Sequence, residues 1–161
     1  MDKFEEKQRF TQWWLWLILL AVCSIPYVPI MMGLDTQTDQ WLGLLAMSIL
    51  LFFIVGLLFL IQLKTKVDEV GIHYQFIPFH FKQKTILWQE IKSAEVRKYE
   101  PLKEYGGWGI KGYSKKNRAY NVKGNMGLQI VLKTGDKILF GTQKEEELRS
   151  FLKSNKKQNK K

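Results

Sequence analysis

The stretch that decides the fold is residues 11–63, TQWWLWLILLAVCSIPYVPIMMGLDTQTDQWLGLLAMSILLFFIVGLLFLIQL. It contains no Lys, Arg, His or Glu, and its only charged residues are Asp35 and Asp39, between two apolar runs. A bilayer core about 30 Å thick is crossed by roughly 20 apolar residues in a helix that rises about 1.5 Å per residue. Residues 11–32 and 41–63 meet that length, so we predict two membrane-spanning helices joined by a short turn.

Details of the two runs agree with membrane insertion. Trp13, Trp14, Trp16 and Trp41 stand where amphipathic rings meet the bilayer interface, and Pro26 and Pro29 are expected to kink the first span. A cleaved signal sequence is a weaker interpretation, because no small-x-small cleavage site leads into a soluble chain.

The charge distribution indicates the orientation of the spans. All but three of the 25 Lys and Arg residues follow Leu63, and the chain carries a formal net charge of +10. Basic residues flank the pair of runs on both sides, while the loop between them has none. Because basic residues stay on the cytoplasmic side, we expect two spans in a bacterial inner membrane with both termini in the cytoplasm.

After Lys66 the sequence changes to short runs that alternate apolar and polar residues. Such a period of two, rich in β-branched and aromatic residues, is typical of strands with one buried face. We predict seven antiparallel strands near residues 68–77, 82–88, 92–100, 107–113, 118–123, 127–133 and 137–141. The first ten residues are expected to be a cytoplasmic lead.

A helix is predicted after the last strand. Thr142 and Glu145 have the spacing of a capping box, and Leu148, Phe151 and Leu152 share one helix face. Residues 154–161 are rich in lysine and have no apolar residue, so we expect a disordered basic tail. The order of seven strands and one helix predicts a pleckstrin-homology-like barrel over residues 65–153, a mainly β fold behind a transmembrane hairpin.

Several segments also resemble a known family. They are Tyr99-Glu100-Pro101, Gly106-Gly107-Trp108-Gly109-Ile110, residues 119–124 and Gly141-Thr142-Gln143. They resemble bacterial pleckstrin-homology-like domains, above all those of small bacterial membrane proteins that tether such a domain to a two-helix membrane hairpin. The resemblance implies a fold and a location, and it brings neither an established activity nor catalytic residues.

The glycine-rich segment is the first candidate site. A phosphate-binding glycine loop needs a following helix, whereas Ile110 onward is predicted to be a strand, so nucleotide binding is disfavoured. The glycines are expected to allow a bend over Trp108, and a partner-binding role is the alternative. The candidate partner-binding residues are Tyr99, Pro101, Gly106, Gly107, Trp108, Gly109 and Lys111.

Basic residues near the predicted hairpin and in the tail form the second candidate site. A domain held close to a bilayer can contact anionic headgroups, and a solvated hairpin tip is the alternative. The candidate headgroup contacts are Lys115, Lys116, Arg118, Lys156, Lys157, Lys160 and Lys161. Nucleic-acid binding is disfavoured because of the membrane tether.

The chain offers little for catalysis. Its single Cys and its two His residues, His73 and His80, predict no metal site, no cofactor is expected, and no spacing groups a nucleophile with a base. We therefore predict a membrane-anchored binding or scaffold module, not an enzyme, that binds a protein segment at the inner membrane surface. The alternatives are a sensor of anionic lipid and a structural subunit that packs through its hairpin.

Overall fold

The computed structural model describes residues 3–10, 13–33, 38–114 and 116–158 of the chain. The chain divides into two compact units. We call Met1–Phe10 together with Ile61–Lys161 the sheet unit, and Thr11–Leu60 the helical unit.

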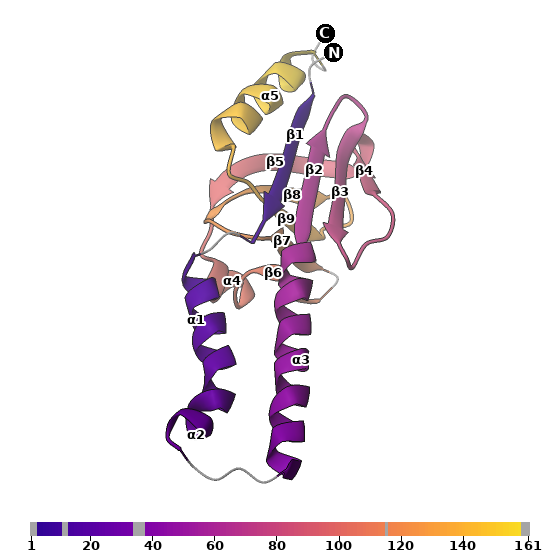
Figure 1. The fold of residues 1–161 in the computed structure, drawn as a ribbon. Coiled ribbons are helices and arrows are strands. Elements are labelled where there is room, and N and C mark those ends of the chain that lie inside the picture. The colour runs from indigo at the N-terminus through magenta and orange to yellow at the C-terminus, as the bar shows by residue number, and fades with distance from the viewer. Residues whose placement is uncertain (1–2, 11–12, 34–37, 115, 159–161) are drawn as a thin grey trace. The chain divides into compact units, whose positions relative to one another are not determined.

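The helical unit has one long helix and one interrupted helical segment (Figure 1). Its elements are α1 (Trp13–Ser24), the 3₁₀ turn η1 (Ile25–Tyr27), α2 (Val28–Met31) and α3 (Thr38–Leu60). Among the helices of the described residues, only α3 holds a segment long and apolar enough to cross a membrane, the 20 residues Trp41–Leu60. The predicted two-helix transmembrane hairpin is therefore wrong, because α1 has 12 residues and rises only about 18 Å.

The interruption of the first apolar run has a local cause. Pro26 stands in the first turn of η1, and a proline has no N–H to donate to the preceding helical turn. The Ser24 hydroxyl, just before it, donates to Leu20 O at 3.0 Å and to Ala21 O at 2.8 Å. Run length and hydrophobicity alone therefore predicted too long a first helix, since they do not show where its backbone hydrogen bonds end.

The sheet unit begins with a strand that the sequence analysis missed. Sheet A has the order β1-β2-β3-β4, built from β1 (Phe4–Arg9), β2 (Gln62–Val67), β3 (Gly71–Ile77) and β4 (Lys84–Leu87). The residues of β1 were assigned to a cytoplasmic lead with no strand predicted, and the start of β2 was assigned to the second span. The two strands pair antiparallel from Phe4 opposite Val67 to Arg9 opposite Gln62.

Sheet B is formed by the chain between residues 91 and 141 in the order β5-β8-β9-β7-β6. Its strands are β5 (Ile91–Lys98), β6 (Gly109–Ser114), β7 (Asn117–Asn121), β8 (Met126–Leu132) and β9 (Lys137–Gly141), and a 3₁₀ turn, η2 (Trp88–Glu90), precedes it. β7 runs parallel to β9, whereas the other pairs are antiparallel.

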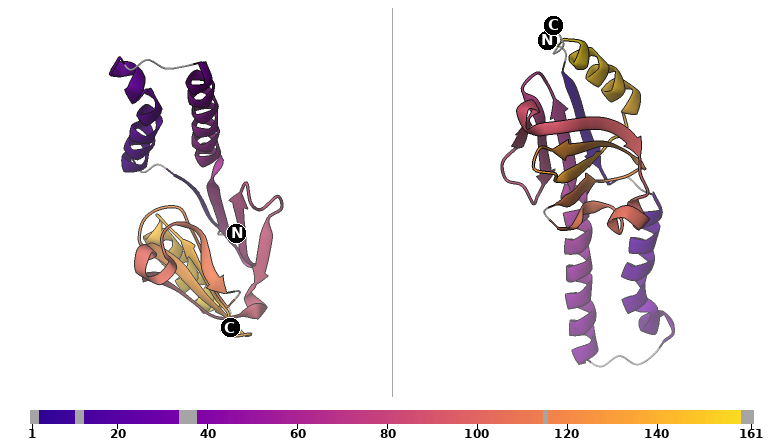
Figure 2. Two further views of the ribbon diagram at one scale, coloured as in Figure 1. Left: turned by 90° about the horizontal axis from the view of Figure 1, so that it is seen from below. Right: turned by 180° about the vertical axis from the view of Figure 1, so that it is seen from behind.

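The predicted seven-stranded barrel is wrong. Each of the seven predicted segments overlaps a strand, but the strands of the described residues number nine and form two separate sheets that do not close. The left panel of Figure 2 shows the two sheets as distinct layers. Alternation of side chains predicts which residues face a core, but it does not determine which strand lies beside which.

The main core lies between the inner faces of the two sheets and α5 (Glu145–Gln158). Sheet A contributes Phe4, Leu63, Val67, Ile72, Tyr74, Phe76 and Ile86; sheet B and the chain after β7 contribute Val96, Tyr120, Val122, Leu128, Ile130, Ile138 and Phe140; and α5 contributes Leu148 and Leu152. A second cluster joins Tyr99, Tyr105, Ala119 and Leu139, where the short helix α4 (Pro101–Tyr105) contributes Tyr105.

The C-terminal helix forms as the sequence predicts, with Leu148 and Leu152 buried, but it is longer. It continues through Gln158, so residues 154–158, which we expected to be disordered, are helical. Each residue added to an existing helix forms one further backbone hydrogen bond, so a helix once formed extends readily. Residues 159–161 lie outside the described part of the chain.

Candidate functional site

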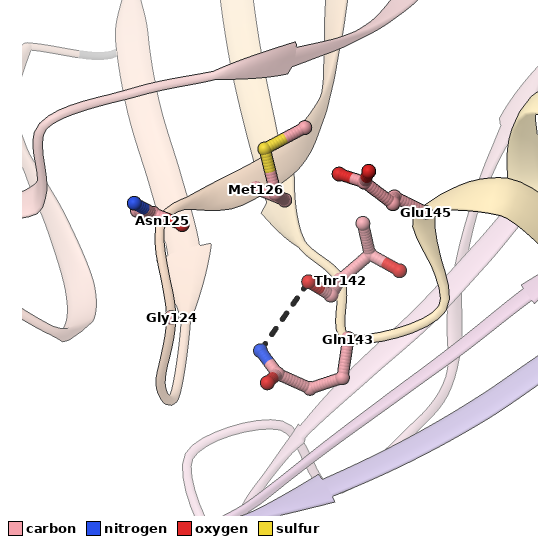
Figure 3. Close-up of a pocket in the computed structure, with 6 residues that line it drawn as sticks. All are labelled: Gly124, Asn125, Met126, Thr142, Gln143 and Glu145. Atoms are coloured by element: carbon pink, nitrogen blue, oxygen red, sulfur yellow. Dashed lines mark hydrogen bonds between the residues drawn. The ribbon is translucent and has the colours of Figure 1, made fainter.

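A pocket lies between the turn that follows β7 and the junction of β9 with α5 (Figure 3). Its volume is about 150 Å³, and its lining residues are Gly124, Asn125, Met126, Thr142, Gln143 and Glu145. Figure 3 shows the Met126 thioether and the Glu145 carboxylate pointing toward one another across it.

Backbone hydrogen bonds fix both walls of this pocket. The Thr142 N–H donates to Met126 O at 2.9 Å, and the Tyr99 N–H donates to Asn125 O at 2.8 Å. The Gln143 side-chain amide donates to Lys123 O at 2.8 Å and to Thr142 O at 3.3 Å. The pocket is therefore held in shape by the protein itself.

A buried carboxylate of β1 supports the pocket from behind. Glu6 is 8% exposed; its Oε2 accepts from the Thr142 hydroxyl at 2.6 Å and its Oε1 accepts from the Gln143 N–H at 2.7 Å. The Thr142 Oγ1 in turn accepts from the Lys144 N–H at 3.1 Å. Thr142 therefore lies just before α5, which begins at Glu145, and its hydroxyl bonds to Glu6 of β1 and to the Lys144 N–H where a capping box with Glu145 was predicted.

The pocket's size and chemistry limit what it can bind. About 150 Å³ is below the roughly 300–1,000 Å³ of typical small-molecule and cofactor sites, but it admits one side chain. The lining offers a carboxylate, amides, a thioether and backbone carbonyls, and Glu146 and Glu147 follow Glu145 in the first turn of α5. This combination favours a cationic or hydrogen-bond-donating side chain.

Several predicted partner-binding residues lie beside this pocket. The Trp108 indole N–H donates to Gly124 O at 3.1 Å. The Gly109 N–H donates to Asn121 Oδ1 at 2.9 Å, and the Asn121 amide donates to the Tyr99 hydroxyl at 3.0 Å. Tyr99 is itself buried, and burial raises the pKa of its hydroxyl. The structure thus brings Tyr99, Trp108 and Gly109 together around the β7–β8 turn.

The other residues of that candidate set shape the backbone. Pro101 begins α4, and Gly106 ends it in the left-handed conformation, with φ of 71°. Gly107 and Gly109 both have φ of 118°, which strongly favours glycine, and β6 then continues as a strand. The expected bend at the glycines is thus observed, and Lys111 follows it on β6, opposite Ala119.

A polar network on sheet B holds α4 in place. Arg97 forms two hydrogen bonds with Glu104, at 2.7 and 3.2 Å, and its guanidinium lowers the pKa of Glu104. Gln129 Oε1 accepts from Arg97 Nη2 at 3.0 Å and from the Tyr105 hydroxyl at 3.4 Å. These side chains satisfy one another and orient the segment that leads to Trp108.

The predicted lipid-contact residues are not gathered into one patch within the described part of the chain. Lys116 is exposed in the β6–β7 turn, and Arg118 is half-buried on β7. Burial, together with the positive charges of Lys84 and Arg118, lowers the pKa of the His80 imidazole. Lys156 and Lys157 belong to the last turns of α5, and Lys115, Lys160 and Lys161 lie outside the described residues.

The two histidines have separate surroundings. His73 lies on the outer face of sheet A, where its ring nitrogens are 2.8 Å from Thr85 Oγ1 and 3.0 Å from Asp68 Oδ1. The His80 ring packs edge-on against Tyr74, with 5.7 Å between ring centroids. No group of three or more His, Cys, Asp and Glu side chains that could hold a metal occurs among the described residues.

No family model matches the chain, and neither a curated protein nor a solved structure is significantly similar to it.

The sequence analysis missed most of the pocket. Thr142 and Glu145 were predicted to form a capping box, and Gly124, Thr142 and Gln143 appeared only within segments that resemble a known family, without a predicted binding role. Glu6 carried no signal because a carboxylate in a short charged segment is typical of a solvated lead. The pocket depends on contacts between residues 6, 99, 125 and 143, and no local pattern records such contacts.

Proposed function

We propose that this chain is a membrane-anchored binding module that captures a protein segment at the bilayer surface. The anchor is proposed from the exposed apolar surface of α3. Its segment Trp41–Leu60 has no charged residue, and none of it is buried inside the protein. Its side chains include Phe52 and Phe53, which are 82% and 67% exposed. An apolar surface of this extent requires a cover, and hydrocarbon suits it along its full length.

The strand register supports a tether at a single place. Arg9 and Gln62 are opposite one another at the end of β1 and the start of β2, so the chain leaves for the helical unit and returns from it at the same end of sheet A. Lys7, Arg9 and Lys64 lie close to these exits in sequence, and the preference of basic residues for the cytoplasmic side supports a sheet unit in the cytoplasm as part of the proposal.

The pocket and the edge of sheet B support a peptide as the ligand. In the observed strand order β6 is an outer strand, so its free edge can accept the backbone of an extended segment. The hydrogen bond from Trp108 to Gly124 holds the start of β6 beside the pocket. A segment added along β6 would have its backbone paired at this edge and a cationic side chain directed to Glu145.

The anchor is tested by extraction of native membranes with alkaline carbonate. Wild-type protein should stay in the membrane pellet. Phe53→Arg introduces a charge at the middle of α3, where it costs about 2.5–3.5 kcal/mol, and should move a large share of the protein to the supernatant. Val70→Arg, at an exposed turn of the sheet unit, is the matched control. Extraction of the wild type by carbonate would refute the anchor.

The binding role is tested by site-specific photocrosslinking in native membranes. A photoreactive side chain at Ile110, on β6, should yield a protein adduct, whereas the same side chain at Lys133, after β8, should not. Glu145→Lys should reduce the adduct about tenfold, since like charges in an interface cost more than about 1.4 kcal/mol. Equal yields at both positions, or a yield indifferent to Glu145→Lys, would contradict the proposal.

A further inference from the structure

One end of sheet A combines exposed aromatic rings with unbalanced positive charge. The register places Arg9, Gln62 and Ile77 in one row across β1, β2 and β3. This row is where the chain passes to and from the helical unit, and we call it the junction end. The β3–β4 turn, residues 78–83, lies beyond Ile77 and therefore projects from the same end.

The β3–β4 turn presents apolar rings to the outside. Phe81 is 94% exposed and Phe79 is 58% exposed, although the backbone around them is held firmly. The His80 N–H donates to Phe76 O at 2.8 Å, and the Gln75 amide donates to His80 O at 3.1 Å and to Phe81 O at 3.3 Å. A turn fixed by three hydrogen bonds while it keeps a phenylalanine in the open is suited to contact an apolar or interfacial partner.

Positive charge is concentrated at the same end. Lys7 and Lys64 are directly opposite one another on β1 and β2, both are exposed, and Arg9 is exposed two residues further on. Like charges opposite one another in a sheet are destabilising unless an anion lies between them. Among the described residues, no acidic side chain forms an ion pair with any of these three.

The opposite end of the same outer face is balanced. There Lys3 pairs with Glu5 at 3.3 Å, and Lys66 pairs with Asp68 at 2.9 Å. The excess of positive charge is therefore a property of the junction end and does not extend along the whole of sheet A.

We propose that the junction end of sheet A lies in the headgroup layer of an anionic bilayer, with Phe79 and Phe81 in the interface and Lys7, Arg9 and Lys64 on lipid phosphates. The inference rests on the proposed membrane anchor and names the lipid class that it prefers. Lys7 and Lys64 are each four residues from the helical unit, a reach of at most about 14 Å. The headgroup layer is about 5–7 Å deep on each side of the hydrocarbon, so these side chains can enter it.

The first test measures lipid preference with the full chain. Protein is reconstituted in nanodiscs of phosphatidylcholine and phosphatidylglycerol, extracted, and the retained lipids are counted by native mass spectrometry. Each lysine near an anionic surface contributes about fivefold, so Lys7→Gln with Lys64→Gln should lower retention of phosphatidylglycerol about 25-fold. Lys133→Gln with Lys137→Gln removes the same charge from the β8–β9 hairpin and should change nothing.

The second test locates the aromatic turn. An environment-sensitive fluorophore on Phe81→Cys should shift to shorter wavelength when the chain enters phosphatidylglycerol discs. The same fluorophore on Val70→Cys, in the β2–β3 turn at the opposite end of the sheet, should report water. Cys23 is replaced by Ser in both proteins so that each carries one label.

The outcomes separate this inference from the anchor. Carbonate extraction of the wild type refutes both. If the chain resists extraction, either of two results refutes the headgroup contact and leaves the anchor. The first is equal retention of phosphatidylglycerol with and without Lys7 and Lys64, and the second is a fluorophore at position 81 that reports water.

Inorganic phosphate is added to phosphatidylcholine discs as a further arm. Thermal stabilisation there that depends on Lys7 and Lys64 would mean a site for free phosphate and would also overturn the proposal.

Discussion

Sheet A and sheet B differ in how the chain assembles them. Sheet B comes from one continuous stretch between residues 91 and 141, whereas the first two strands of sheet A are separated by the whole helical unit. A long insertion between paired strands is inexpensive, because each doubling of a loop adds only about 0.6 kcal/mol of closure entropy. Sheet A can therefore hold the helical unit between two neighbouring strands without losing its pairing.

The two sheets also expose different chemistry. The junction end of sheet A carries Phe79, Phe81 and unpaired basic residues, which suit a bilayer surface. Sheet B is linked to a small acidic pocket through Trp108 and Gly124, which suits a polar side chain. We infer a division of roles, in which sheet A fixes the unit at the membrane and sheet B presents the ligand site.

The largest expected effect is the loss of Phe4, the residue of β1 that is buried in the core. Phe4 is 1% exposed in the core that both sheets share, and Phe140 of sheet B is equally buried. Phe4→Ala should lower the free energy of unfolding by about 3–5 kcal/mol, the usual cost of emptying a buried phenylalanine site. The measurement is urea unfolding in detergent micelles, followed by near-ultraviolet circular dichroism.

Phe140→Ala serves as the reference for that experiment, with a loss of similar size. If Phe4→Ala changed the unfolding free energy by less than about 0.5 kcal/mol, as expected of an exposed lead, then β1 would not be an integral strand. The comparison of an interrupted sheet with a continuous one would then fail.

The next largest effect is expected at the contact between β1 and the pocket. Glu6→Ala removes the acceptors of the Thr142 hydroxyl and the Gln143 N–H, and a buried donor without a partner costs about 1–3 kcal/mol. Glu6→Gln retains one side-chain oxygen, so its free energy of unfolding should lie between those of the wild type and Glu6→Ala. The same urea unfolding series gives the stability, and Glu5→Ala, exposed on the other face of β1, should have almost no effect.

Glu6 also links the two roles. If the pocket needs β1, Glu6→Ala should reduce the photocrosslinked adduct at Ile110 even at temperatures where the sheet unit stays folded. An unchanged adduct together with reduced stability would show that β1 supports the fold but not the ligand site.

The sequence revealed much of the local structure and little of the assembly. Segments 127–133 and 137–141 are rich in Leu, Ile, Val and Phe and are separated by the turn Thr134-Gly135-Asp136, so their strands were predicted almost to the residue. In β1 the core-facing residues are Phe4, Glu6 and Gln8, and two polar side chains on a buried face erase the apolar alternation. The parallel pairing of β7 with β9 leaves no trace in either strand, and it is one reason that the predicted antiparallel barrel does not form.

The smallest expected effect compares two carboxylates, Asp68 in the β2–β3 turn of sheet A and Glu104 on α4, which Arg97 of sheet B holds. Burial would raise the pKa of Asp68, but hydrogen bonds from Lys66, His73 and the backbone N–H groups of Val70 and Gly71 outweigh it, so the pKa lies well below its ordinary value of 3.8. Bonds from Arg97 likewise lower the pKa of Glu104 from 4.5. A lowered folded-state pKa gives stability that is present above the unfolded-state value and is lost as the pH falls through the folded-state value.

Asp68→Asn should therefore destabilise the sheet unit by about 1 kcal/mol at about pH 7, and the difference from wild type should shrink as the pH falls below about 4. Glu104→Gln should follow the same pH dependence with a smaller amplitude, below about 1 kcal/mol, because its side chain is 35% exposed and solvent screens its ion pair, whereas Asp68 is 20% exposed. Thermal unfolding midpoints at several pH values measure both. If Glu104→Gln lowered the stability more than Asp68→Asn, the expected order of the two effects would be contradicted. The ion pair that holds α4 on sheet B would then stabilise the fold more than the hydrogen bonds of Asp68.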